Sequence, residues 1–200
     1  MKILEKLTRP ISFYAGILVI IIFCFCTFTS FILFPPPFSP LDNWLSDLGN
    51  PSYNNIGAFF FNIGCILTGI LLFPFSIGFF KWYRDDLWHK ILMIITQIIG
   101  CTTGFALVML GIYSEAFAEL HVFWANTFFI FNLSFLIFAS LSLLMHSDFI
   151  KLISLYGIVV VIVNLLFLFF FVTPILEWFT VFTALGYVGL IVYNMYLVMD

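Results

Sequence analysis

The side chains that could do chemistry in this chain are acidic groups and one imidazole, placed in three short polar segments between apolar runs. They are Asp42 and Asp47, then Glu115, Glu119 and His121, and finally Glu177. Carboxylates of this kind suit Ca²⁺ or Mg²⁺, and carboxylates with an imidazole could bind a transition metal. A carboxylate and a histidine in one cleft could also perform general acid–base catalysis. The remaining interpretation is a solvated acidic rim that binds nothing. The sequence contains no specific metal motif, and it names no cofactor.

The apolar runs that must position these groups are long enough to cross a membrane. The 200 residues are 64% hydrophobic and 8% charged, whereas about a quarter of the residues in soluble proteins are charged. A helix needs about 20 apolar residues to span the hydrocarbon core. We predict a single all-α domain over residues 1–200, with six transmembrane helices at about 11–34, 57–80, 91–113, 122–145, 152–173 and 178–199.

The basic residues predict the orientation of this bundle. All seven Lys and Arg precede the first span or fall in alternate connections: Lys2, Lys6, Arg9, Lys81, Arg84, Lys90 and Lys151. Positive residues favour the cytoplasmic side, so we expect a multi-pass protein of the cell membrane with both termini in the cytoplasm. The acidic segments would then lie outside. The first span lacks a small-residue cleavage site, and we expect it to be a retained anchor.

The first outer connection carries signals for a short helix. Ser39 can cap it, Pro40 suits its first turn and Gly49 can end it in a left-handed conformation. Apolar residues recur at helical spacing over 40–48, which predicts a helix lying in the membrane interface. Long structured connections are often lids or binding elements. The alternative is that this connection only covers the outer end of the bundle.

Two stretches of the chain resemble a known family. The run "LSDLGNPSYNNIGAFFFNIGCILTGILL" resembles the signature of a six-span prokaryotic membrane family called domain of unknown function 998, and "GIYSEAFAELHVFWANTFF" resembles its second landmark. More distantly, the Ser-Asp-x-Gly turn is similar to that of Frag1/DRAM-like membrane proteins. The resemblance implies a fold and a membrane location but no known reaction. Its landmarks here are Ser46, Asp47, Gly49, Asn62, Gly69, Gly111 and His121.

Small and polar residues predict how the spans pack. Gly100 and Gly104 form a Gly-xxx-Gly pair, which typically allows close helix contact. We assign it to the bundle interior, and we also name this face as a candidate surface for a homo-oligomer. Asn62 and Asn132 lie on similar interior stripes. Asn164 is expected to hydrogen-bond a neighbouring helix.

Several functional classes lack their characteristic residues. A membrane zinc hydrolase would need several histidines together, but only His121 is expected outside, while His89 and His146 fall at the inner surface. No Gly-rich phosphate loop or basic patch for nucleic acid is present. No ionisable side chain lies deep in a span, which argues against a proton relay.

These patterns predict an outer polar pocket that recognises a lipid headgroup or a cation, with membrane lipids as the partners. One alternative is a lipid-modifying enzyme that uses Asp47 and His121. Another is a non-catalytic assembly or sensing subunit. We further expect Asp47 to approach His121 or Asn62, directly or through one water. The candidate ligand-binding residues are Ser46, Asp47, Asn62, Glu115, Glu119, His121 and Glu177.

Overall fold

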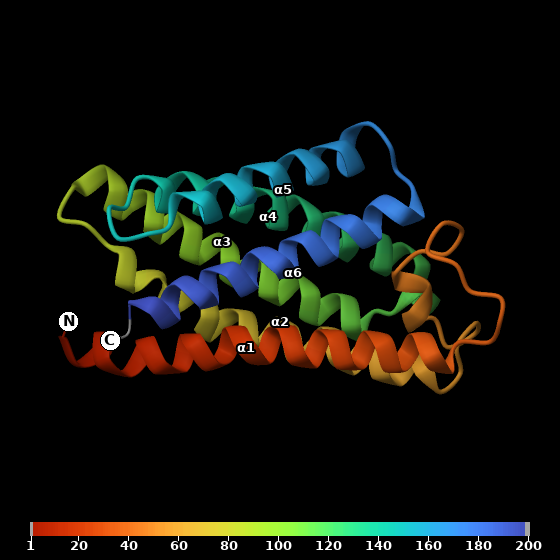
Figure 1. The fold of residues 1–200 in the computed structure, drawn as a ribbon. Helices are drawn as coiled ribbons and strands as arrows, with labels where there is room; N and C mark the ends of the chain where they lie inside the picture. The colour runs from red at the N-terminus through yellow and green to blue at the C-terminus, as the bar shows by residue number, and fades with distance from the viewer. Residues whose placement is uncertain (1, 199–200) are drawn as a thin grey trace.

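Each long apolar run forms one helix in the computed structural model, which describes residues 2–198, with side chains from residue 11 onward. Within that range the chain forms six long helices and no strand (Figure 1). The α-helices are α1 (Lys2–Leu33), α2 (Gly57–Ile77), α3 (Leu87–Ile112), α4 (Ala118–Leu144), α5 (Lys151–Phe169) and α6 (Pro174–Leu197). Three short 3₁₀ helices join them: η1 (Ser46–Gly49), η2 (Gly78–Trp82) and η3 (Glu115–Phe117).

In the described residues, six helical segments are long and apolar enough to cross a membrane. The chain is therefore a multi-pass membrane protein. Its fifth helix ends at Phe169, before the predicted end of the fifth span at residue 173. The predicted end of the sixth span, at residue 199, lies outside the described residues.

The helices follow one another around the bundle, and α6 closes the arrangement against α1. The beginning of α1 and the end of α6 lie at the same end of the molecule (Figure 1). We call this the basic end, since it carries all the segments with Lys or Arg. The acidic end is the opposite one, formed by the α1–α2, α3–α4 and α5–α6 connections (Figure 1).

Glycines allow α2 and α3 to touch along their backbones. A Cβ added to Gly69 would lie 2.5 Å from the carbonyl oxygen of Gly104, and one added to Gly104 would lie 2.6 Å from that of Gly69. Gly100 similarly faces the side chain of Ser76. The Gly100/Gly104 face thus contacts α2 of the same chain.

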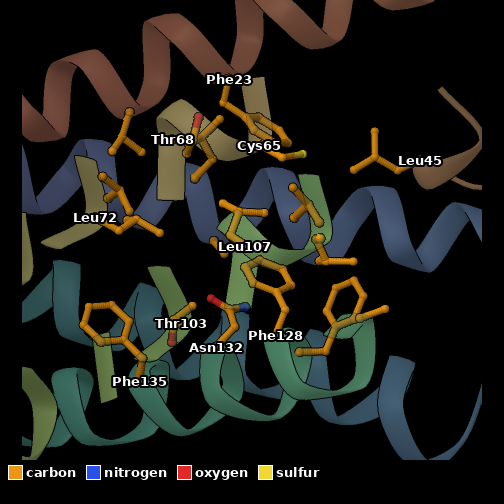
Figure 2. Close-up of a pocket in the computed structure, with 18 of the residues that line it drawn as sticks. Phe23, Leu45, Cys65, Thr68, Leu72, Thr103, Leu107, Phe128, Asn132 and Phe135 are labelled. Carbon is orange, nitrogen blue, oxygen red and sulfur yellow. The ribbon is translucent and has the colours of Figure 1, made fainter. Parts of the chain in front are cut away.

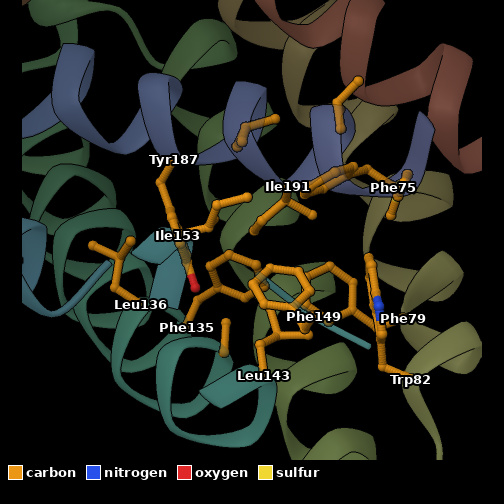
Figure 3. Close-up of a cluster of buried hydrophobic side chains, with 14 of the residues drawn as sticks. Phe75, Phe79, Trp82, Phe135, Leu136, Leu143, Phe149, Ile153, Tyr187 and Ile191 are labelled. Carbon is orange, nitrogen blue, oxygen red and sulfur yellow. The ribbon is translucent and has the colours of Figure 1, made fainter. Parts of the chain in front are cut away.

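The basic half of the bundle is filled with large apolar side chains (Figure 3). Trp82 packs edge-on against Phe79 and Phe149, with ring centroids 5.3 and 5.4 Å apart. Nearer the middle, the amide of Asn132 on α4 donates to Asn164 Oδ1 on α5 over 3.0 Å, which confirms the predicted interhelical bond. The bundle is therefore tightly packed on the side away from the acidic connections.

The helix predicted over 40–48 is not continuous, and that expectation was wrong. One helical turn follows Ser39, and η1 begins only at Ser46. In an α-helix, the N–H groups of Trp44 and Leu45 would bond to carbonyls four residues earlier. Here the carboxylate of Asp47 accepts from Trp44 N, and the carboxylate of Glu177 accepts from Leu45 N. These side chains take the donors that would have continued the helix.

Candidate functional site

The first connection is attached to the start of α6 by two hydrogen bonds. Glu177 Oε2 accepts from the Leu45 backbone over 2.7 Å, and the indole of Trp178 donates to the Asn43 carbonyl over 3.2 Å. Glu177 lies in the first turn of α6, where the helix dipole favours a negative charge. Its side chain is only 7% exposed. Residues 43–46 are thereby held across the acidic end of the bundle.

A second set of bonds attaches the same connection to α1. Asn54 donates to Ser30 Oγ and to the Leu48 carbonyl, and Ser30 Oγ donates to that carbonyl over 3.0 Å. Asn54 and Ser30 are fully buried. A Cβ on Gly57 would lie 2.3 Å from the Asn54 amide, so this position has room only for glycine. These contacts make the connection a fixed part of the bundle.

Gly49 is required by a close approach and not by its backbone conformation. The left-handed conformation predicted for it is absent, because no described glycine has a positive φ. An added Cβ would lie 2.5 Å from Asn62 Oδ1 and 2.8 Å from the Phe61 ring. Asn62 Nδ2 donates to the Gly49 carbonyl over 2.9 Å. The Gly49 backbone thus rests directly on α2.

Beneath this connection lies a cavity of about 110 Å³ inside the bundle (Figure 2). Five helices line it, namely α1, α2, α3, α4 and α6, and Leu45 and Ser46 of the first connection lie over its acidic end. No described residue of α5 contributes. On α2 the lining runs from Phe61 to Ser76, which at 1.5 Å per residue corresponds to about 22 Å along the helix. The cavity is therefore long and narrow.

Four of the seven candidate residues line this cavity, and they do so at its acidic end. They are Ser46, Asn62, His121 and Glu177. The other three do not line it: Asp47, Glu115 and Glu119. Glu119 is exposed, while Asp47 is buried and Glu115 is partly buried. The sequence predicted that these acidic residues lie together. In the structure only Glu177 lies at the cavity, whereas Asp47, Glu115 and Glu119 lie behind it or away from it.

Asp47 makes hydrogen bonds within its own connection and to the Glu115 side chain. Its Oδ2 accepts from Trp44 N over 2.9 Å and from the Asn43 amide over 3.2 Å. We expected a direct approach to His121 or Asn62, but neither is a hydrogen-bond partner of Asp47 in the structure. Asn62 instead contacts the connection two residues later, at Gly49. A contact through one water stays a prediction.

Glu115 lies behind the cavity, close to Asp47. It accepts a hydrogen bond from the Asn50 amide over 3.1 Å. Asp47, Glu115 and Glu177 are near enough for their charges to repel one another. No ion pair compensates them among the described residues, because the segments that carry Lys and Arg lie at the basic end. The acidic end therefore holds three adjacent carboxyl groups, which accept from backbone and amide N–H groups, and Glu115 is also hydrogen-bonded to the Asp47 side chain.

The hydrogen bond of His121, which lines the cavity, determines which of its nitrogens is left as an acceptor. Its Nδ1 lies 3.0 Å from the Tyr113 carbonyl oxygen. A carbonyl can only accept, so Nδ1 carries the proton, and Nε2 of the neutral ring keeps a free lone pair. Nε2 has no hydrogen-bond partner within the described range, although His121 is only 9% exposed. His121 thus offers an unused acceptor at a buried position.

The other two histidines lie far from His121, as predicted. His89 and His146 meet at the basic end, with ring centroids 6.2 Å apart. His146 lies in the α4–α5 connection, and burial lowers its pKa while the neighbouring Asp148 opposes that effect. Among the side chains that the structure describes, no group of three or more His, Cys, Asp or Glu could hold a metal ion.

Sequence reasoning missed several polar residues deeper in the cavity. Thr68, Thr103 and Asn132 line it below the acidic end, and Figure 2 shows them around the same space as Phe23 and Phe128. Thr68 is 3% exposed, and its hydroxyl has no hydrogen-bond partner within the described part of the chain. Asn132 was assigned to an interior stripe, but not to a site. The available signal was a polar side chain recurring every three residues along α2, at Asn62, Cys65 and Thr68.

Comparison with known proteins identifies a family but not an activity. Neither the curated proteins nor the solved structures contain a match to this chain. One family model matches residues 17–198, nearly the whole chain, and it is described as a protein of unknown function, DUF998. The match includes all the lining residues of the cavity and the connection above it. With six membrane-spanning helices and this match, the chain belongs to the DUF998 family of membrane proteins.

Proposed function

We propose that this protein binds a membrane lipid in the cavity between its helices, with the lipid headgroup at the acidic end. The observation that carries the proposal is the division of the cavity lining. Ser46, Asn62, His121 and Glu177 surround its acidic end, while apolar side chains, chiefly phenylalanine and leucine, make up most of the remainder. Ligand pockets typically combine apolar walls with a few polar groups that fix orientation. An amphipathic molecule fits such a lining.

The packing of the basic half supports binding and not transport of an ion. The aromatic cluster around Phe79 and Trp82 fills the bundle on that side (Figure 3). A pore would need a hydrated path through this region. The lining of the cavity reaches Ser76 on α2 but does not include Phe79 or Trp82, so a molecule could occupy the cavity without crossing the bundle. The positive residues at the opposite end support an outer location for the acidic end of the cavity.

Two other functions have less support. A lipid-modifying enzyme that uses Asp47 and His121 would need both groups at one reacting centre, but Asp47 does not line the cavity. Its carboxylate already accepts from Trp44 and Asn43. A purely structural assembly or sensing subunit would be expected to fill its interior with side chains. The cavity under the first connection favours a ligand.

The lipid-binding proposal can be tested by filling the cavity. Ala125 on α4 lines it, whereas Ala116 lies exposed on η3. We expect the purified wild-type protein to retain a lipid that mass spectrometry detects after mild detergent extraction. Ala125→Phe should lose this lipid, and the matched control Ala116→Phe should keep it. Equal retention by both variants, or no retained lipid in the wild type, would contradict the proposal.

A further inference from the structure

The charge balance at the acidic end of the cavity restricts the headgroup that could bind there. Glu177 faces the cavity, with Asp47 and Glu115 close behind it. Buried charges are costly unless an opposite charge or hydrogen bonds compensate them. Apart from the hydrogen bond between the Glu115 and Asp47 side chains, the partners described for these carboxyl groups are backbone and amide N–H groups, which supply hydrogen bonds but no positive charge. A cationic group in the cavity would supply the missing charge, whereas a phosphate or sulfate would be repelled.

Unused hydrogen-bond acceptors provide a second, independent observation. His121 Nε2 has a free lone pair, because Nδ1 is bound to the Tyr113 carbonyl. Asn62 uses its Nδ2 to donate to Gly49, which leaves its Oδ1 as an acceptor without a partner among the described residues. Glu177 accepts from Leu45 and has further lone pairs. All three side chains line the same end of the cavity.

These acceptors match the donors of one chemical group. A protonated primary amine carries three N–H donors, no acceptor and one positive charge, as in a lysine side chain. An alcohol offers one donor and no charge, and a quaternary ammonium offers the charge without donors. The amine is the group that can satisfy the carboxylate, the imidazole and the amide oxygen together.

The shape of the cavity indicates how many chains the ligand has. A volume of about 110 Å³ has room for about seven to eleven water-sized groups, at 10 to 15 Å³ for each. The lining runs for about 22 Å along α2, from Phe61 to Ser76. A space so long and so small in volume can hold one extended chain, but two chains side by side would not fit.

We infer that the ligand of this cavity is a single-chain amphiphile with a protonated primary amine, which lies against Glu177, His121 and Asn62. This inference rests on the proposed lipid binding and adds the chemical class of the lipid. The apolar chain would lie along α2, past the unpartnered hydroxyl of Thr68. The amine nitrogen would lie under Leu45 and Ser46.

Matched probes test the headgroup separately from lipid binding. The probes are four amphiphiles with the same alkyl chain, ending in a primary amine, a trimethylammonium, an alcohol or a sulfate. Their affinities are measured at neutral pH by titration of the full-length protein in nanodiscs, with empty nanodiscs as the blank. We expect the amine to bind most tightly, about tenfold or more above the alcohol, and the sulfate to bind most weakly.

Two variants identify the responsible carboxylate. Glu177→Gln removes the charge but keeps an oxygen that can accept from Leu45, so the fold should be retained. It should abolish the preference for amine over alcohol. Glu119→Gln removes the same charge from an exposed position at the same end, and it should leave the preference unchanged.

The outcomes separate the two proposals. Equal binding of amine and alcohol to the wild type, or tightest binding of the trimethylammonium or the sulfate, would overturn the amine inference and leave lipid binding in place. An amine preference that survives in Glu177→Gln would also overturn it. If none of the four probes binds above the blank, both the inference and the proposed lipid binding fail.

Discussion

Glu177 on α6 accepts a hydrogen bond from the backbone N–H of Leu45, with 2.7 Å between Oε2 and the nitrogen and 132 residues between them in sequence. This contact joins the first connection to the last helix directly above the cavity. It also replaces the bond that Leu45 would make in a continuous helix. One carboxylate therefore shapes the connection and lines the candidate site.

The first prediction concerns this hydrogen bond. Glu177→Ala should destabilise the protein by about 1–3 kcal/mol, because it leaves the buried Leu45 N–H without an acceptor. Glu177→Gln should cost much less, since its amide oxygen can still accept. The thermal unfolding midpoint in detergent measures both effects, and hydrogen exchange at Leu45 should accelerate only in the alanine variant. Equal destabilisation by both substitutions would mean that the hydrogen bond is not the cause.

The second prediction concerns the contact between Gly49 and α2. Gly49→Ala should destabilise by about 1–3 kcal/mol, because its methyl group would overlap Asn62 and Phe61. Adding Asn62→Ala should recover part of the loss, since the two sites are coupled. Gly189→Ala is the control, because its methyl would lie 3.3 Å from the end of the Ile20 side chain. A Gly49→Ala protein as stable as this control would refute the close approach.

The third prediction distinguishes the two aspartates of the first connection. Asp47 is 7% exposed and accepts from Trp44 and Asn43, whereas Asp42 is exposed. Asp47→Ala should therefore lower both the unfolding midpoint and the amount of retained lipid, and Asp42→Ala should change neither. If Asp42→Ala lowers the unfolding midpoint and the retained lipid as strongly as Asp47→Ala does, this prediction is wrong.

The fourth prediction concerns the orientation in the membrane. Asp42 and Arg84 are both exposed and lie at opposite ends of the bundle. With both termini in the cytoplasm, a cysteine at 42 should react with a membrane-impermeant thiol reagent in intact cells, and a cysteine at 84 only after permeabilisation. The reverse labelling pattern would mean that the protein has the opposite orientation, with the acidic end of the cavity on the cytoplasmic side.

The sequence alone was sufficient to predict the six helices and the separation of basic from acidic connections. A long apolar run has few alternatives in a bilayer, because a helix satisfies all of its own backbone hydrogen bonds there. Glycines at helical spacing likewise indicated that Gly100 and Gly104 face another helix. Such patterns are local, and the residues that create them lie within a few turns of one another.

Only the tertiary structure showed which polar groups share a space. The local signals at Ser39 and Pro40 favour a helix over 40–48, but Asp47 and the distant Glu177 take its N–H donors. The predicted bundle also placed Asp47 and Glu177 at the same end. Glu177 lines the cavity and Asp47 does not, and this difference depends on the path of the first connection. The sequence determined the side of the membrane at which each carboxylate is expected, because that depends on the order of spans. The direction in which each carboxylate points and its hydrogen-bond partners depend on contacts between segments far apart in the chain. No local sequence pattern records such contacts.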